Sequence, residues 1–340
     1  MTVVTAPAAV PDTAFTSAPT TLAMPAAEIR RTELSTFLRT RRERLNPVEL
    51  GLPPGARRRT PGLRREEVAQ LAGVGVTWYT WLEQGRRINA STQVLDAIAR
   101  TLRLDQAEHE HLYRLADVPG LIPTEPEAAF EPGAQRILDE LGSPACITND
   151  RFDVLAWNAA YRNLFPFRFT TASTRLRNSM WCMFTLPRCC GPSLDVDAEL
   201  PLMVATFRAN YSRHVGEPAW EEFIAELGAV SPEFREMWAN HDVSAHVTAT
   251  KRFRHHAVGE VTFTAVSMRL LATPANRVVV YLPADDETAT SMRRLAEGTV
   301  SAPATLPCGH PRLPGSAPRQ VEAAEPATLT ATAIAPLPQS

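Results

Sequence analysis

Hydrophobic and polar residues follow a helical period over residues 62–104, with one break. Apolar side chains recur three and four positions apart on either side of Gly73, which is the spacing of one buried helix face. A helix that stops and restarts within about four residues needs a residue that tolerates positive φ, and glycine supplies it. Val74 is expected to be buried in the turn, and Tyr79 and Leu82 continue the apolar stripe. The pattern predicts two short helices joined by a tight turn.

Three more helices are predicted around this pair. The first covers 33–45; its apolar side holds Leu34, Phe37, Leu38 and Leu45, and the arginines that point elsewhere are Arg39, Arg41, Arg42 and Arg44. Another follows Ser91, a good N-cap, and the last covers 106–116. In such a bundle the second helix of the turn motif keeps an outer face free, which is the geometry of a DNA-reading helix-turn-helix. The alternative is a helical bundle that uses the turn for packing alone.

The outer face of that second helix carries side chains suited to DNA. Threonine and glutamine can reach base edges, and a threonine methyl suits the methyl group of thymine. An exposed tryptophan indicates a contact surface. Arginine pairs at both ends of the motif are placed to meet phosphates. A triple arginine before the motif could also bind phosphate; the alternative is a run of charges that is only solvated. The predicted DNA-contacting residues are Arg57, Arg58, Arg59, Arg64, Arg65, Gly75, Val76, Thr77, Thr80, Trp81, Gln84, Arg86 and Arg87.

Residues 133–285 combine helices and strands. A helix is predicted over 133–141, followed by short strands at 145–148 and 153–157 and by a helix that Asn158 opens. Helical stripes fill the middle, and β-branched residues predict three strands at hairpin spacing, at 246–253, 260–271 and 277–282. The pattern N-x-A-x-x-x-L-F after a strand resembles the beginning of a PAS domain. We predict an α+β sensor-like domain with an antiparallel sheet on one side and helices across it.

Composition indicates a multi-domain chain. Residues 1–29 and most of 286–340 are Ala- and Pro-rich and are expected to be disordered tails. The Pro-rich stretch 119–132 is expected to link a DNA-binding domain at 30–118 to a second domain at 133–285. Residues 30–120 carry 16 arginines against 11 acidic residues, whereas 121–340 carry 19 basic against 24 acidic residues. This asymmetry suits one domain that meets DNA phosphates and one that does not.

Five sequence blocks occur in an order that is typical of one family. They are RRTPGLRREEVAQLAGV (58–74), VTWYTWLEQGR (76–86), DVLAWNAAYRNLF (153–165), SPEFREMWANHDV (231–243) and KRFRHHAVGE (251–260). On these blocks the chain resembles the MmyB-like bacterial transcription regulators, with a Cro/repressor-type (XRE-family) helix-turn-helix, from about residue 32 to 283. It departs from them at Gly75, where a serine often stands, at Trp81, where many relatives carry arginine, and at His256, where a proline is usual. The first two departures bear on the operator sequence.

The resemblance implies a five-helix, all-α DNA-binding domain and a PAS-like ligand-binding domain with an apolar cavity. Relatives are associated with fatty-acid-like ligands. Such a ligand needs an apolar tube and a cationic or hydrogen-bonding mouth. Candidates for the tube are Trp157, Met180, Trp181, Phe184, Phe207 and Trp238, and candidates for the mouth are Arg208, Arg252 and Arg254. Each could instead be core packing or a surface charge.

Motifs for catalysis are missing from the sequence. It holds no G-x-S-x-G, P-loop or H-E-x-x-H, so we expect no enzyme activity, cofactor or metal. Cys182, Cys189 and Cys190 near His214 leave a redox or metal sensor open, although their spacing fits no zinc pattern. A C-terminal domain that docks a protein partner and has no ligand is the other alternative.

The expected context follows from cysteine content and hydropathy. Five cysteines without a disulfide pattern suit a reducing cytoplasm, and no apolar run approaches the roughly 18 residues of a membrane span. One helix-turn-helix covers only a half-site, so a homodimer on a pseudo-palindromic operator is expected. We therefore expect a cytoplasmic regulator whose partners are double-stranded DNA, a small apolar ligand and a second copy of the chain.

Overall fold

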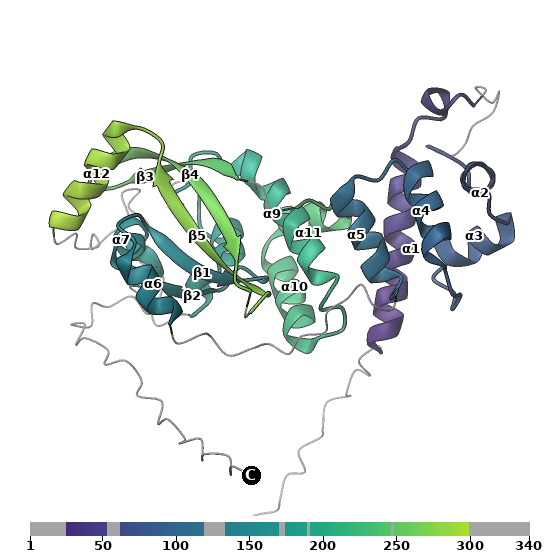
Figure 1. The fold of residues 1–340 in the computed structure, drawn as a ribbon, viewed down its shortest axis with the longest axis horizontal. Coiled ribbons are helices and arrows are strands. Elements are labelled where there is room, and N and C mark those ends of the chain that lie inside the picture. Colours follow the sequence, from purple (N-terminus) through teal and green to yellow (C-terminus); the bar gives the residue numbers. More distant parts are fainter. Residues whose placement is uncertain are drawn as a thin grey trace, which may run out of the picture. The chain divides into compact units, whose positions relative to one another are not determined.

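The structure is a computed structural model that describes residues 25–52, 62–118, 133–169, 174–188, 191–245, 248–271 and 273–298. It divides into two compact units (Figure 1). The first comprises residues 1–124, 208–228 and 237–244, and the second comprises 125–207, 229–236 and 245–340. The predicted linker at 119–132 and most of the predicted tails lie outside the described residues. No helix within the described ranges is long and apolar enough to cross a membrane.

The N-terminal region is helical, as predicted. Its elements are α1 (Ala26–Arg44), the 3-10 helix η1 (Pro47–Leu50), α2 (Arg65–Ala72), α3 (Val76–Glu83), α4 (Thr92–Thr101) and α5 (Gln106–Leu115). Helix α1 packs against α3 and α5, α2 packs against α3 and α4, and α4 packs against α5. The apolar core of this bundle includes Phe37, Leu38, Leu63, Val68, Tyr79, Leu95, Ile98 and Leu112.

Helix α1 begins earlier than the sequence pattern predicted. It starts at Ala26 rather than at residue 33, so residues 26–29 are helical and the expectation of a tail over 1–29 was too long. Pro25 precedes the helix with φ −58°, which is a favourable backbone angle for entering a helix. Ala26 and Ala27 have high helix propensity and Glu28 lies in the first turn, where a negative charge is favoured. The alanines lack the apolar periodicity on which the prediction depended.

Two arginines of α1 lie inside the bundle, although they were predicted to point away from its apolar side. Arg41 and Arg42 are buried beside Leu34, Phe37 and Leu38. Acidic residues on other helices compensate the charges, with Glu108 near Arg41 and Glu83 near Arg42. The periodicity of a single helix does not reveal such long-range partners.

The turn of the helix-turn-helix has the predicted form. Gly73 ends α2 in the left-handed region at φ 68°, and the amide of Val74 donates to the carbonyl of Ala69 at 2.9 Å. This is the bonding of a glycine C-cap. At the other end of α2, the Glu67 carboxylate accepts the amide of Arg64 at 2.7 Å. Val74 is half-buried rather than buried.

A five-stranded sheet forms the centre of the second unit, in the order β2-β1-β5-β4-β3. The strands are β1 (Ala145–Asn149), β2 (Val154–Trp157), β3 (Ala249–His255), β4 (Gly259–Arg269) and β5 (Asn276–Pro283). Every pairing is antiparallel, and the register places Cys146 opposite Trp157 on one side and Val279 on the other. The predicted α+β class and antiparallel sheet are confirmed. Strand β3 starts at Ala249 instead of the predicted 246; residues 246 and 247 lie outside the described ranges.

Helices cover both faces of this sheet. On one face α6 (Ala134–Glu140) packs Leu138 against Ile147 and Val280. On the other face α7 (Ala159–Leu164) and α12 (Asp286–Glu297) pack against an aromatic cluster of Tyr161, Phe165, Phe253 and Phe263, with Trp157, Phe167, Phe169 and Tyr281 at its margin. Asn158 caps α7, since its side chain accepts the amides of Tyr161 at 2.9 Å and Ala145 at 3.0 Å. The predicted helix start at Asn158 is therefore confirmed.

Helix α12 lies in the range that was expected to be mostly tail. Asp285 caps it by accepting the amide of Thr288 at 2.7 Å. Met292 and Leu295 are buried in the aromatic cluster. The helix is rich in charged residues, so its narrow apolar side is difficult to recognise without the sheet against which it packs.

The remaining elements are short or divided between the units. In the second unit lie the 3-10 helices η2 (Pro166–Phe169) and η3 (Thr174–Arg177) and helix α8 (Ser179–Thr185). Helices α9 (Val196–Tyr211), α10 (Pro218–Val230) and α11 (Pro232–Ala239) each contribute residues to both units.

Candidate functional sites

Helix α3 presents a mixed polar and apolar face to solvent. Val76 is 48% exposed and Trp81 is 41% exposed. Gly75, Thr77 and Gln84 are also exposed, and Thr80 is half-buried. Tyr79 and Leu82, which the sequence assigned to the core, are buried. The helix is therefore oriented as predicted, with six of the predicted DNA-contacting positions on its outer side or at its ends.

Arginines flank this face. Arg64, Arg65, Arg86 and Arg87 are all exposed, and the Arg86 guanidinium carbon lies 5.8 Å from the centre of the Trp81 ring. Arg65 also donates from Nε to Glu83 Oε1 at 2.9 Å, so one of its donors is already engaged within the bundle. Arg57, Arg58 and Arg59 lie outside the described residues.

A buried carboxylate holds α3 in place, and the sequence analysis missed it. The Glu83 side chain is fully buried and accepts hydrogen bonds from Arg42 Nε at 2.8 Å and Arg42 Nη2 at 2.9 Å. Its backbone carbonyl accepts the Ser35 hydroxyl at 2.6 Å. The bidentate pair ties α3 to α1 with defined geometry. The available signal was that Glu83 stands four residues after Tyr79, on the same buried helix face.

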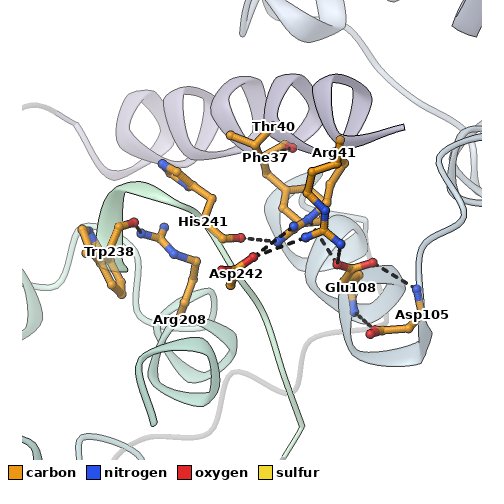
Figure 2. A network of polar contacts seen from close by, with 10 residues as sticks. Phe37, Thr40, Arg41, Asp105, Glu108, Arg208, Trp238, His241 and Asp242 are labelled. Atoms are coloured by element: carbon orange, nitrogen blue, oxygen red, sulfur yellow. Dashed lines mark hydrogen bonds and ion pairs between the residues drawn. The ribbon is translucent and has the colours of Figure 1, made fainter. Parts of the chain in front are cut away.

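A second buried arginine joins α1 to α5 and to residues 241–242 (Figure 2). Arg41 Nε lies 3.2 Å from Glu108 Oε1, and Nη1 lies 3.4 Å from Asp242 Oδ1. Nη2 donates to the His241 carbonyl. Burial raises the pKa of Glu108. Its carboxylate is oriented by a capping box, in which the Glu108 amide donates to Asp105 Oδ1 at 2.8 Å and the Asp105 amide donates to Glu108 Oε2 at 3.1 Å. All these residues belong to the first unit.

Arg208 is the third member of this charged interior. Its side chain is fully buried, Nη1 donates to Glu33 Oε2 at 2.6 Å, and Nη2 donates to the Trp238 carbonyl. The guanidinium carbon lies 3.5 Å from the centre of the Trp238 ring. Burial raises the pKa of Glu33, although the neighbouring arginine opposes that shift. From the sequence, Arg208 was a candidate for the mouth of a ligand tube; in the structure its charge is matched by Glu33 on α1.

The other two mouth candidates have acidic partners as well. Arg252 donates from Nε to Asp195 Oδ2 at 2.9 Å, and Arg254 donates from Nη2 to Glu260 Oε1 at 3.0 Å. Both arginines are on β3 and exposed. The two arginines are two residues apart, so they point to the same side of the strand, opposite to buried Phe253.

The tube candidates fall into several groups of aromatic contacts. Trp157 stacks on Phe169 with ring centres 4.4 Å apart, at the margin of the aromatic cluster. Met180 is buried on α8. On the same helix, the centre of the Trp181 ring lies 4.5 Å from the Arg175 guanidinium carbon. Phe184 packs on Phe234 at 5.4 Å and Phe207 on Phe152 at 6.4 Å. Trp238 belongs to the first unit, whereas the other five belong to the second. Ligand contact by any of them stays a prediction.

Arg168 on η2 lies beside the aromatic cluster and was not among the ligand-binding candidates predicted from the sequence. It is 7% exposed and lies against Phe165 and Phe167, with its guanidinium carbon 5.4 and 5.5 Å from their ring centres. Its Nη1 donates to Ser179 Oγ at 3.3 Å and to the Leu176 carbonyl at 3.5 Å. An arginine inside the aromatic run FPFRF (165–169) was the available signal.

Comparison with protein families separates the same two regions. A model described as a helix-turn-helix domain matches residues 33–112. A model described as the MmyB-like transcription regulator ligand binding domain matches residues 130–295. The chain carries both domains of an MmyB-like transcription regulator. No curated protein matched the sequence. The resemblance inferred from the five blocks is thus confirmed, and the protein is a DNA-binding transcription regulator with a ligand-binding domain.

The charged interior of the first unit joins residues from both matched regions. Glu33, Arg41 and Glu108 lie in the helix-turn-helix match, and Arg208 and Asp242 lie in the match to the MmyB-like ligand-binding domain. The ion pairs between them occur within one compact unit. Residues 208–228 and 237–244 of the ligand-binding domain therefore pack with the DNA-binding helices.

The cysteines and histidines of the MmyB-like domain offer little reactive chemistry where the structure describes them. Burial raises the pKa of the Cys146 thiol to about 12 and that of Cys182 above its usual range, which disfavours the reactive thiolate. The His214 ring stacks on Trp220. Within the described ranges no group of three or more His, Cys, Asp or Glu residues could hold a metal ion. Cys189 and Cys190 are not among the described residues.

Proposed function

We propose that the protein reads a specific operator through α3 and that a fatty-acid-like ligand of its C-terminal domain regulates this binding. The observation that carries the first part is the orientation of α3. Its apolar residues Tyr79 and Leu82 are buried, while Val76, Thr77 and Trp81 are exposed. Such a face, flanked by exposed arginines, suits insertion into a major groove.

The DNA complex is proposed to contain two copies of the chain. A single helix-turn-helix covers a half-site, so two copies would bind half-sites about 34–36 Å apart on a pseudo-palindrome. Exposed Arg64, Arg86 and Arg87 would neutralise phosphates and release counterions. Affinity should then fall steeply with salt concentration. A regulator that acts on chromosomal DNA is expected to work in the cytoplasm.

Selection from sheared genomic DNA tests this proposal. The full chain would be incubated with genomic fragments, bound fragments sequenced, and a recovered site used in titrations at several salt concentrations. The proposal expects a two-fold-related motif, a 2:1 protein-to-duplex complex and a salt-dependent affinity. Failure to enrich any sequence over input DNA would contradict specific operator reading.

The ligand proposal depends on the second unit. An apolar face of its sheet is covered by the aromatic cluster, and the tube candidate Trp157 lies at the margin of that cluster. Large apolar and aromatic surface with a few placed polar groups is typical of small-molecule sites. We also propose that this domain is PAS-like, which is supported by the antiparallel sheet and the strand followed by the Asn158-capped helix.

Extraction of the purified full chain tests the ligand proposal. The protein would be isolated under native conditions and denatured, and its released small molecules identified by mass spectrometry. The proposal expects an acyl compound in near-stoichiometric amount that changes the affinity for the operator when it is added back. A full chain that carries no ligand and whose DNA affinity does not respond to acyl compounds would favour regulation by a protein partner instead.

A further inference from the structure

Arg168 differs from every other buried arginine that the structure describes. Five arginines are buried in the described ranges. Four of them form ion pairs with a carboxylate: Arg41 with Glu108, Arg42 with Glu83, Arg208 with Glu33 and Arg277 with Asp150. Arg168 has no carboxylate within ion-pair distance among the described residues. The residues that follow its 3-10 helix, TTAS at 170–173, include no acid either.

The guanidinium of Arg168 is also incompletely hydrogen-bonded. Arginine has five N–H donors. Nη1 donates to Ser179 Oγ at 3.3 Å and to the Leu176 carbonyl at 3.5 Å, and both distances are longer than the usual range for N–H···O bonds. Nε is buried and has no acceptor among the described residues. Arg41 and Arg208 also have an Nε without a hydrogen-bond acceptor, but each has a carboxylate partner, which Arg168 lacks among the described residues.

The surroundings of Arg168 make an uncompensated charge unfavourable. The Phe165 and Phe167 rings lie against its guanidinium, and fully buried Tyr161 packs on Phe165 with ring centres 4.9 Å apart. Ring contacts of this kind attract a cation, but removing a guanidinium from water costs several times more than they return. Arginine cannot escape this penalty by losing a proton. An anion from outside the chain would complete the site.

We propose that Arg168 binds the carboxylate of a small monocarboxylic acid whose hydrocarbon part packs on the aromatic cluster. This inference rests on the proposed ligand-sensing function and assigns the residue that holds the charged end of the ligand. A planar guanidinium matches a carboxylate with two parallel hydrogen bonds. Nε still lacks an acceptor among the described residues, and the Ser179 hydroxyl lies beside the same guanidinium and can donate to a carboxylate oxygen. One buried positive charge balances one negative charge, and the rings of Phe165 and Phe167 match a hydrocarbon.

Two probes of equal chain length test the assignment. Dodecanoate and 1-dodecanol would be titrated separately into the full chain by calorimetry, after native lipids have been removed. Dodecanoate should bind about 10- to 100-fold more tightly, because charged hydrogen bonds are worth about 1.5–3 kcal/mol. Arg168→Met should abolish this preference by weakening dodecanoate alone, and Arg168→Lys should retain part of it.

Arg277→Met is the matched control. It removes the other buried arginine of the second unit, which pairs with Asp150 on the sheet, so it should leave the preference for the acid intact. Thermal unfolding provides a readout that does not need binding. In ligand-free protein, Arg168→Met should unfold at the same temperature as the parent or higher, whereas Arg277→Met should unfold at a lower one, because it breaks the ion pair of buried Asp150.

The outcomes separate this inference from the proposed function. Equal binding of the two probes, or a preference that survives Arg168→Met, overturns the role of Arg168. Absence of dodecanoate binding overturns the assignment of a monocarboxylate. A neutral molecule recovered by extraction would support ligand sensing and still overturn the inference. An extracted acid that Arg168→Met no longer retains would support both.

Discussion

The helix-turn-helix and the aromatic cluster differ in how the positive charge of a buried arginine is compensated. In the helix-turn-helix, the buried arginines have carboxylate partners within the chain, as Arg42 and Glu83 show, and the side chains offered to a partner are exposed on α3. Beside the aromatic cluster a buried arginine, Arg168, has no carboxylate partner among the described residues. An exposed set suits a macromolecule that meets the surface, and a buried one suits a small molecule that enters the domain. A buried charge with an internal counter-ion is therefore structural, whereas one without a counter-ion indicates a binding site.

Replacing Glu83 should have the largest effect. Glu83→Ala removes the carboxylate that accepts two hydrogen bonds from buried Arg42 and releases Arg65 Nε, so the free energy of unfolding should fall by about 3–5 kcal/mol. Urea denaturation of the full chain measures it. The control is Glu66→Ala, because Glu66 is an exposed partner of Arg64 at 3.4 Å and should contribute less than about 1 kcal/mol. Similar losses in the two variants would contradict a structural role for the buried pair.

Substitutions on the outer face of α3 should have the opposite profile: they should weaken operator binding and leave the free energy of unfolding nearly unchanged. Thr77→Ala and Trp81→Ala should each weaken operator binding by about 1–3 kcal/mol, roughly 5- to 150-fold. Both side chains are exposed, so the urea midpoint should change little. Titration of each variant with the selected operator measures the effect, and Gln106→Ala on the exposed side of α5 serves as control. Unchanged affinity in both variants would show that a different face reads the DNA.

His111 offers a test by pH. It is fully buried against Phe37, neither ring nitrogen has a hydrogen-bond partner among the described residues, and burial holds its pKa well below the usual range. The unfolded chain then binds a proton that the folded chain does not, so stability is complete above about pH 6.5 and falls with acidification, by about 1.4 kcal/mol per pH unit.

His111→Leu should remove this contribution. Urea midpoints from pH 8 to pH 5 would compare the variant with the parent protein. The two proteins should have similar stability at pH 8, and the variant should lose less as the pH falls. Parallel curves for the two proteins would exclude His111 as a source of acid sensitivity.

Gly75 should produce the smallest effect. It caps α3 without a side chain, its φ of −65° is open to any residue, and a Cβ would meet only the Trp78 Cβ, at 3.9 Å. Gly75→Ser should add a cap and restrict the unfolded chain, which would stabilise the fold by about 0.5–1 kcal/mol. Gly73→Ser is the contrast, because a side chain at φ 68° is strained by about 1–2 kcal/mol. Urea midpoints of both variants measure the difference; a loss of stability in Gly75→Ser would contradict the capping argument.

Local features could be predicted from the sequence and long-range ones could not. The glycine turn at Gly73, the burial of Tyr79 and Leu82, and the cap at Asn158 depend on a few neighbouring residues, and each is found in the structure. The burial of Arg41 and Arg42 depends on Glu108 and Glu83, more than 40 residues away. Because an isolated helix pattern contains no such partners, it assigned both arginines to the wrong environment.

The candidate ligand site illustrates the same limit. Arg208, Arg252 and Arg254 were candidates by residue type, and each has an acidic partner that only the fold reveals. Arg168 stands in an aromatic run that resembles core packing, and its lack of a counter-ion becomes evident only when its neighbours in space are known. Helix α12 was missed because its few apolar residues form a pattern only against the sheet.

The ion pairs of α1 have a consequence for exchanging domains between related regulators. Glu33 and Arg41 are matched to Arg208 and Asp242, which lie more than 160 residues further along the chain. In a hybrid joined within 119–132, Glu33 and Arg41 would come from one parent, and the residues at positions 208 and 242 would come from the other and need not carry matching charges. Such hybrids should accumulate as folded protein only when these four positions are transplanted together, so a specificity swap should be planned around the matched set rather than around the linker.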